Sequence, residues 1–497
     1  MIARQLDKLL RKKTLSCIGV NEDIPGFNIS IAGISCILLL EKREQEVSAS
    51  AEKAQERYSS ESLLDDLIDM GVNVDIHYGK IIRQLQNENY IFVDEMDRYA
   101  SKGLSSVLIR LIDTVYPSMK GFMLVAFFVQ TIEEVLSGRK DPQDALEQVT
   151  GVLDLKSVKV ELSSFPRKDL ESFKSILISP LKKIENDNNS SEFSSLYQKR
   201  LEKREKTIQY LTQMIKEKGD LPVLPLNDKF IRQKINQTFS STSEIAEIIL
   251  SDVGMTVNVL KAMNMGRGGR PVSTISHAIM LMGNEELKKI IDDFVSLETV
   301  TDESHRDEIQ ATYVSAYMSF SITRQVAFKA EIKDTEEMCI CSMLHNIGQM
   351  IVLYYYPEAH ERIKNLMRHK NSNKRKAARQ VLGTTYDNIG IHFAEQWRFP
   401  FMTVESLRVC YFNRIGKTKE NLIINLPFCA TELCAFCGGV LNPAQTYRLR
   451  ELINCLNMFS RDLAALLEKA WTDTLNFSKK QKISIKKRAM AEIAATG

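Results

Sequence analysis

The sequence lacks an apolar run long enough to cross a membrane. Its longest apolar runs are residues 29–40 and 121–129, and both are shorter than the roughly 20 residues that a spanning helix needs. No signal peptide is recognisable, and the nine cysteines have no regular spacing. We therefore expect a cytoplasmic protein with reduced thiols and no transmembrane segment.

A large excess of charge of one sign is also missing. The 66 Lys and Arg residues are nearly balanced by 63 Asp and Glu residues, which leaves a net charge of +3. This balance excludes a chain built as a whole to coat nucleic acid, so any such binding has to be local. Two basic patches, residues 368–379 and 479–488, contain no interleaved aromatic residues, so base stacking finds no support in them.

The 497 residues are too many for one compact core and predict two or three domains. The expected fold class is mainly α. We expect a mixed, mostly helical N-terminal domain over residues 1–166, and a linker with a charged connector helix over residues 167–218. Next we expect an all-helical domain over residues 219–475, followed by a basic C-terminal tail over residues 476–497. The polar residues 186–195 are the predicted linker itself.

Residues 60–95 of the N-terminal domain show the order helix, turn, helix, strand. Ser60 can cap a first helix, a second is expected over residues 74–87, and a strand over residues 90–93. Winged-helix DNA-binding modules have this order, and so do many partner-binding helical modules. The aspartates of the first helix would repel phosphates; they are Asp65, Asp66 and Asp69.

Two other segments of this domain have patterns that suggest strands. Residues 27–40 fit either a buried strand or a buried helix, because periodicity does not separate the two. Residues 158–162 alternate between apolar and polar side chains, which predicts a strand.

In the second domain, apolar residues recur at helical spacing, which predicts a series of helices. These are residues 245–263, 276–294, 309–327, 336–354, 358–367, 388–397 and 422–436. The fourth of these segments contains His345. Apolar residues surround it at helical spacing, so we expect His345 near a buried helical face with Asn346 beside it.

Several ordered blocks of this domain resemble the HDOD family, the HD-related output domains of bacterial signalling proteins. The blocks are DVGMTVNVLKAMN (252–264), AIMLMG (278–283), MLHNIGQMIVLYYYPEAHERI (from residue 343) and LGTTYDNIGIHFAEQWRFP (382–400). The resemblance covers about residues 221–467.

The resemblance also implies a degenerate metal site. The related HD phosphohydrolases carry a His-Asp pair that holds a hydrolytic metal, whereas this chain has His345 and Asn346. A carboxamide offers no charge to a divalent cation. Three further ligand positions fall on Ser315, Tyr386 and Thr431. We therefore expect no metal, no cofactor and no catalytic residue, but a neutral hydrogen-bonded network of these five side chains around His345.

Two other groups of residues have a chemical and a structural interpretation. Arg267 and Arg270, among the glycines at 266, 268 and 269, fit an anion-binding loop or a turn between helices. Cys429, Cys434 and Cys437 have the spacing of a metal or cluster site, but the residues between them prefer a helix, which favours core thiols.

The predicted function is a non-catalytic bacterial signal-transduction protein whose HDOD domain binds a protein partner. The first alternative is an HD-type metal-dependent phosphohydrolase with a rearranged site of His345, His392 and Glu432. The second is a DNA-binding regulator acting through the N-terminal domain. Nucleotide or nucleic-acid binding has no direct support in the sequence.

Overall fold

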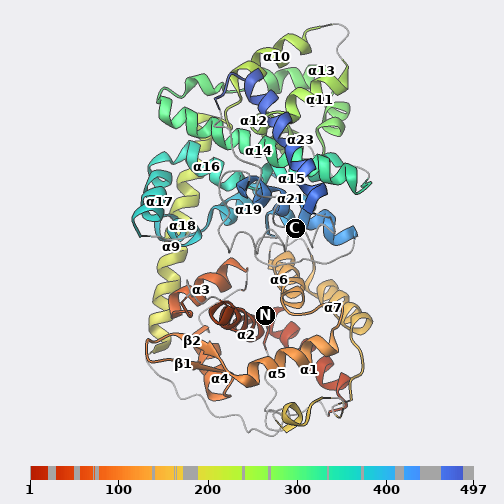
Figure 1. Ribbon diagram of the computed structural model, residues 1–497, viewed down its shortest axis with the longest axis vertical. Coiled ribbons are helices and arrows are strands. Elements are labelled where there is room, and N and C mark those ends of the chain that lie inside the picture. Colours follow the sequence, from red (N-terminus) through yellow and green to blue (C-terminus); the bar gives the residue numbers. More distant parts are fainter. Residues whose placement is uncertain are drawn as a thin grey trace. The chain divides into compact units, whose positions relative to one another are not determined.

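The computed structural model divides the chain into two compact units, Met1–Lys199 and Arg200–Gly497 (Figure 1). It describes residues 2–20, 30–49, 56–70, 72, 78–136, 140–161, 163, 165–171, 189–237, 241–266, 270–332, 335–370, 374–408, 419–436 and 460–484. These residues are mainly helical, and their one sheet has two strands, as the predicted fold class requires.

The first unit is a group of helices with one β-hairpin. Its elements are α1 (Ile2–Cys17), α2 (Ile31–Ala49), α3 (Ser60–Asp69), α4 (Tyr78–Asn87), β1 (Ile91–Val93), β2 (Tyr99–Ser101), α5 (Gly103–Val115), α6 (Phe122–Leu136) and α7 (Pro142–Lys156). The expected helix–helix–strand order is confirmed, and β2 adds an antiparallel partner to β1.

Helix α2 lies at the centre of this unit, where Figure 1 shows it surrounded by other elements. It contacts α3, α4, α5, α6 and β2. The apolar residues of its first half are buried around the helix because neighbouring elements cover that half; they include Ile34, Ile37 and Leu40. Ser30 caps the helix by accepting a hydrogen bond from the amide of Gly33. The ambiguous segment is therefore a buried helix.

The strand predicted over residues 158–162 is wrong. Residues 158–161 are irregular, and residue 162 lies outside the described residues. The amides of Val158 and Val160 donate instead to the carbonyls of Val115 and Cys17. Because these acceptors belong to the ends of two helices, the alternating pattern has no strand with which to pair.

The second unit is built almost wholly from helices. Helix α9 (Asn189–Lys218) belongs to this unit from Arg200 onward. The elements that follow are α10 (Pro225–Ile235), α11 (Thr242–Leu250), α12 (Val253–Gly266), α13 (Ile275–Asp292), η2 (Leu297–Thr299), α14 (Glu303–Lys329), α15 (Thr335–Leu344), α16 (Ile347–Tyr355), α17 (Pro357–Lys370), α18 (Lys374–Leu382), α19 (Tyr386–Gln396), α20 (Phe401–Arg408), α21 (Lys419–Phe436) and α23 (Ser460–Lys480).

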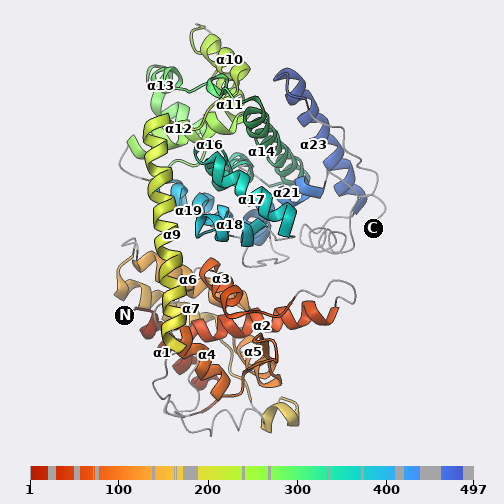
Figure 2. The same ribbon diagram turned by 90° about the vertical axis from the view of Figure 1, so that its left-hand side faces the viewer.

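Helix α14 organises the core of this unit. It contacts α15, α16, α21 and α23, and Figure 2 shows α14 and α23 side by side. The larger hydrophobic cluster includes residues of α12, α16 and α19, and a second cluster joins the C-terminal half of α14 to α21 and α23.

Three predicted helices are interrupted in the structure, and in the segment 276–294 the interruption is at Gly283, whose φ is +72°. The segment 245–263 divides before α12, where the buried Asp252 side chain accepts from the amide of Met255 at 3.2 Å. An aspartate at a helix start satisfies amides that have no partner within the helix. The segment 336–354 divides at His345 and Asn346, which form the turn between α15 and α16.

Two other boundaries differ from the sequence prediction. Helix α9 begins at Asn189, inside the run expected to be a linker, and residues 186–188 lie outside the described residues. The residues expected to form a tail begin within α23, where Phe477 is buried. The side chain of Gln481 donates a hydrogen bond from Nε2 to Asn227 Oδ1 at 2.7 Å. Residues 476–484 therefore belong to the second unit, and residues 485–497 lie outside the described residues.

No single helix among the described residues has both the length and the composition to cross a membrane. Helices α15 and α16 are long and apolar enough only when taken together, and the pair is bent by 42°. Every residue of this pair is buried or half-buried within the unit.

Candidate functional site

The turn between α15 and α16 places His345 inside the second unit. Its side chain is 7% exposed, and its ring meets the Phe428 ring edge to face at a centroid distance of 5.8 Å. Its Nδ1 atom has no hydrogen-bond partner within the described residues. Burial lowers the pKa of His345 to about 4, although Asp387 and the backbone of Ser406 act in the opposite direction. The ring is therefore neutral at neutral pH.

Asn346 is half-buried and begins α16. Its side chain makes no capping hydrogen bond, but its carbonyl oxygen accepts from the amides of Gln349 at 3.0 Å and Met350 at 3.2 Å. The residue thus has a backbone role in starting the helix, and its carboxamide adds no charge beside His345.

Close packing of α16 on α19 brings the next part of the site into place. A Cβ atom at Gly348 would lie 1.8 Å from the Tyr386 carbonyl oxygen and 2.6 Å from the Gly390 amide nitrogen. Only glycine permits this approach, because both neighbours are backbone atoms. The first turn of α19 therefore carries Asp387 close enough to act electrostatically on His345.

The carboxylate of Asp387 forms an ion pair with an arginine side chain. Arg375, on α18, places its Nη2 3.2 Å from Asp387 Oδ2. Lys374 lies with its Nζ 5.5 Å from the centroid of the Tyr386 ring. Arg375 and Lys374 both lower the pKa of His345, so the histidine faces positive charge as well as a carboxylate. A divalent cation here would have to displace the guanidinium and overcome this repulsion.

Tyr386 belongs to a separate buried chain of polar groups. Its hydroxyl lies 2.9 Å from His360 Nδ1, and His360 Nε2 lies 3.2 Å from Glu308 Oε1. The neutral tautomer that fits both contacts carries its proton on Nε2, so Tyr386 donates to Nδ1 and the ring donates to Glu308. Lys364 Nζ also contacts Glu308 Oε1, at 3.0 Å. Burial lowers the pKa of His360 and raises that of Tyr386.

Ser315 and Thr431 make their contacts elsewhere. Ser315 is exposed on α14, and its carbonyl oxygen accepts from Cys434 Sγ at 3.6 Å. Thr431 Oγ1 donates to the carbonyl of Pro427, one turn earlier in α21, at 3.1 Å. Since the tyrosine is paired with another histidine, the predicted neutral network around His345 is wrong.

The described residues around His345 do not form a ligand set for a divalent metal. Among the residues that the structure describes, no three His, Cys, Asp or Glu side chains converge as a ligand group. His345, His392 and Glu432 are all described, so the rearranged ligand set is not assembled either. Burial and the charge of Arg204 lower the pKa of the half-buried His392.

The other groups singled out in the sequence are only partly described. Arg267 lies outside the described residues, and Arg270 is exposed after α12. Cys437 also lies outside them, whereas Cys429 and Cys434 are buried free thiols on α21.

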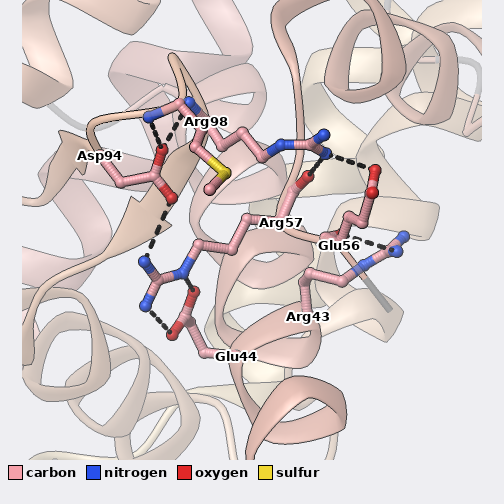
Figure 3. A network of polar contacts seen from close by, with 7 residues as sticks. Arg43, Glu44, Glu56, Arg57, Asp94 and Arg98 are labelled. Carbon is pink, nitrogen blue, oxygen red and sulfur yellow. Dashed lines mark hydrogen bonds and ion pairs between the residues drawn. The ribbon is translucent and has the colours of Figure 1, made fainter. Parts of the chain in front are cut away.

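The β-hairpin of the first unit is surrounded by paired charges (Figure 3). Arg57 Nε lies 2.8 Å from Glu44 Oε1, and Arg57 Nη1 lies 3.2 Å from Asp94 Oδ2. Arg98 Nη1 lies 2.8 Å from Glu56 Oε2, and the Arg98 amide donates to Asp94 Oδ1. Arg57 therefore joins the hairpin turn to α2, and the nearby carboxylates neutralise both arginines.

Comparison with known families identifies the second unit. The HDOD domain model matches residues 221–411. The chain contains an HDOD domain. The matched segment runs from the start of the second unit's core through α20, and it includes the α15–α16 turn with His345.

Individual relatives are distant. An uncharacterized protein of Treponema pallidum (strain Nichols) is 23% identical over 193 residues, which are 38% of this chain and 37% of that protein. The MmoQ response regulator of Methylococcus capsulatus is 18% identical, with a TM-score of 0.39, over 50% of this chain and 98% of that chain. An HDOD domain protein of unknown function from Geobacter sulfurreducens is 16% identical, with a TM-score of 0.33, over 57% of this chain and 99% of that chain.

Sequence reasoning missed most partners of His345 and Tyr386 within the HDOD domain. Asp387 was adjacent to a residue already singled out, so a search for carboxylates near Tyr386 could have found it. His360 and Glu308 lie on α17 and α14, far apart in sequence, and no local spacing predicts that they meet.

Proposed function

We propose that the HDOD domain is a non-catalytic part of a bacterial signalling protein and acts by binding a partner protein. The observation that carries the proposal is the ion pair between Arg375 and Asp387 beside His345. A guanidinium neutralises the carboxylate that acts on His345, and the neighbouring Asn346 supplies no charge. The HDOD match itself supports a role in signalling.

A metal-dependent phosphohydrolase is less well supported by the same geometry. Such an enzyme needs a metal that lowers the pKa of its bound water, and this metal needs several anionic or imidazole ligands. His345 is the one ligand retained from the expected set, and its electrostatic neighbours include two cations.

DNA binding through the first unit gains no support from the hairpin. Phosphate contacts require cationic side chains that are available to the backbone of the duplex. Arg57 and Arg98 are instead held by carboxylates, so the turn of the hairpin offers little uncompensated positive charge.

Cross-linking in the native cell tests the partner proposal. We expect the full-length protein to be cross-linked to a specific protein, and mass spectrometry should map the linked peptides to residues 200–497. The matched comparison is residues 1–199 of the same chain, recovered in the same experiment. Cross-links confined to residues 1–199, or no specific protein above a mock purification, would contradict the proposal.

A further inference from the structure

A cavity of about 730 Å³ opens on the second unit, away from the α15–α16 turn. Residues of α9, of α17 with the residue that precedes it, and of α18 line it. They are Lys203, Lys206, Thr207, Tyr210, Tyr356, Arg362, Asn365, Leu366, Gln380 and Val381. This volume lies in the range of pockets that hold small molecules and cofactors.

The wall formed by α9 is held against the end of α18 by one close backbone approach and by two hydrogen bonds from side chains to backbone carbonyls. Gly383 follows α18 with φ +73°, and a Cβ atom there would lie 2.7 Å from the Arg204 amide nitrogen. Thr207 Oγ1 donates to the carbonyl of Leu382 at 2.8 Å, and the Lys203 ammonium donates to the carbonyl of Gln380. The pocket therefore lies between helices that these contacts join.

One part of the lining is cationic. Lys203, Lys206 and Arg362 contribute positive charge, and none of the residues that line the cavity is acidic. Burial, together with the charges of Arg362 and Arg200, lowers the pKa of Lys203. Burial is the larger cause; the smaller part due to Arg362 and Arg200 is repulsion between positive charges, which a bound anion would relieve.

Two tyrosines form the other part of the lining. The Tyr210 and Tyr356 ring centroids are 4.4 Å apart, and the rings are tilted by 44°. Arg362 Nη2 donates to the Tyr356 hydroxyl at 3.3 Å, which joins the aromatic part to the cationic part. Burial raises the pKa of Tyr210, and the negative charges of Glu358 and Glu217 raise it further. Because these carboxylates repel an anion, an anion is favoured at the lysines rather than beside the Tyr210 ring.

We propose that this pocket binds a nucleotide, with its phosphates at Lys203, Lys206 and Arg362 and its base against Tyr210 and Tyr356. Lysine and arginine side chains recognise phosphate by charge and by hydrogen bonds, and aromatic rings stack on bases. Asn365 and Gln380 add amide groups that can hydrogen-bond to a base or a sugar. The site lies outside the His345 cluster and does not depend on the partner-binding proposal.

Calorimetric titration of the full-length protein with ATP, adenosine and tripolyphosphate, in the presence of EDTA, tests the proposal. We expect ATP to bind at least about tenfold more tightly than either fragment, because only ATP fills both parts of the pocket. Equal affinities for ATP and tripolyphosphate would overturn the assignment of a base site. No heat of binding up to about 5 mM ATP would overturn the whole proposal.

Variants at exposed positions locate the binding. Lys206→Glu should weaken ATP binding at least about tenfold, because it reverses a charge in the pocket. Lys216→Glu, on the same helix but outside the pocket, should change it by less than about twofold. Tyr210→Ala should weaken ATP binding and leave tripolyphosphate binding unchanged. Equal losses in Lys206→Glu and Lys216→Glu, or ATP binding unaffected by Tyr210→Ala, would contradict the assigned site.

Discussion

At the scale of single residues, the HDOD domain keeps a histidine where a metal ligand is expected but surrounds it with different chemistry. His345 is buried against Phe428, its Nδ1 has no hydrogen-bond partner in the part of the chain that the structure describes, and Arg375 pairs with the nearby Asp387. Sequence alone predicted that the His-Asn pair lacks a metal ligand. It could not predict the arginine, because Arg375 and Asp387 come close enough to act electrostatically on His345 only through tertiary packing.

The buried imidazole should make stability depend on pH. The folded-state pKa of about 4 lies below the ordinary value of 6.5, so the unfolded chain takes up a proton that the folded chain excludes. The stability contributed by neutral His345 is present above pH 6.5 and is lost as the pH falls toward 4. Between about pH 7.5 and pH 5 the loss amounts to about 2 kcal/mol.

Urea unfolding of wild type and His345→Gln at these two pH values measures this contribution. We expect the wild type to lose about 2 kcal/mol more than the variant, whose carboxamide does not titrate. His277→Gln is the control, because His277 is exposed on α13, and it should follow the wild type. Parallel pH dependences of wild type and His345→Gln would show that the buried ring is protonated freely.

At the scale of elements, the packing of α16 on α19 builds the site. Gly348 allows the two helices to approach until its α-carbon faces backbone atoms of Tyr386 and Gly390. The sequence predicted these helices from their apolar spacing, but the apolar run continues through His345 and hides the break between α15 and α16. The break before α12 carries a local sign, because Asp252 is a favourable N-cap residue.

Gly348→Ala should therefore disrupt the HDOD domain. The added methyl group meets a carbonyl oxygen and an amide nitrogen that cannot rotate away, so we expect a loss of about 2–4 kcal/mol or failure to fold. Thermal unfolding followed by circular dichroism measures the effect. Gly266→Ala, at the end of α12 with no atom near the added Cβ, is the control and should remain near wild type. Equal melting temperatures for the two variants would contradict the close packing of α16 on α19.

At the scale of the whole molecule, the chain joins a helical unit with a charge-paired hairpin to an HDOD unit with its own core. Most residue contacts lie within one of the two units, which divide between Lys199 and Arg200. The sequence located a polar run near this boundary but predicted a linker where α9 has already begun. The Asn and Ser residues of this run have low helix propensity, but they extend the charged helix that follows them, and extending an existing helix is easier than starting one.

We propose that the HDOD domain retains a histidine but performs no metal-dependent hydrolysis. The most direct measurement is turnover of phosphomonoester and phosphodiester substrates with manganese, iron or magnesium, alongside metal analysis by mass spectrometry. Wild type, His345→Ala and Asn346→Asp are compared. We expect equal background rates and no stoichiometric metal in any of them, because one added carboxylate does not rebuild a ligand set. Turnover by the wild type that His345→Ala abolishes, or stoichiometric metal in Asn346→Asp, would contradict the claim.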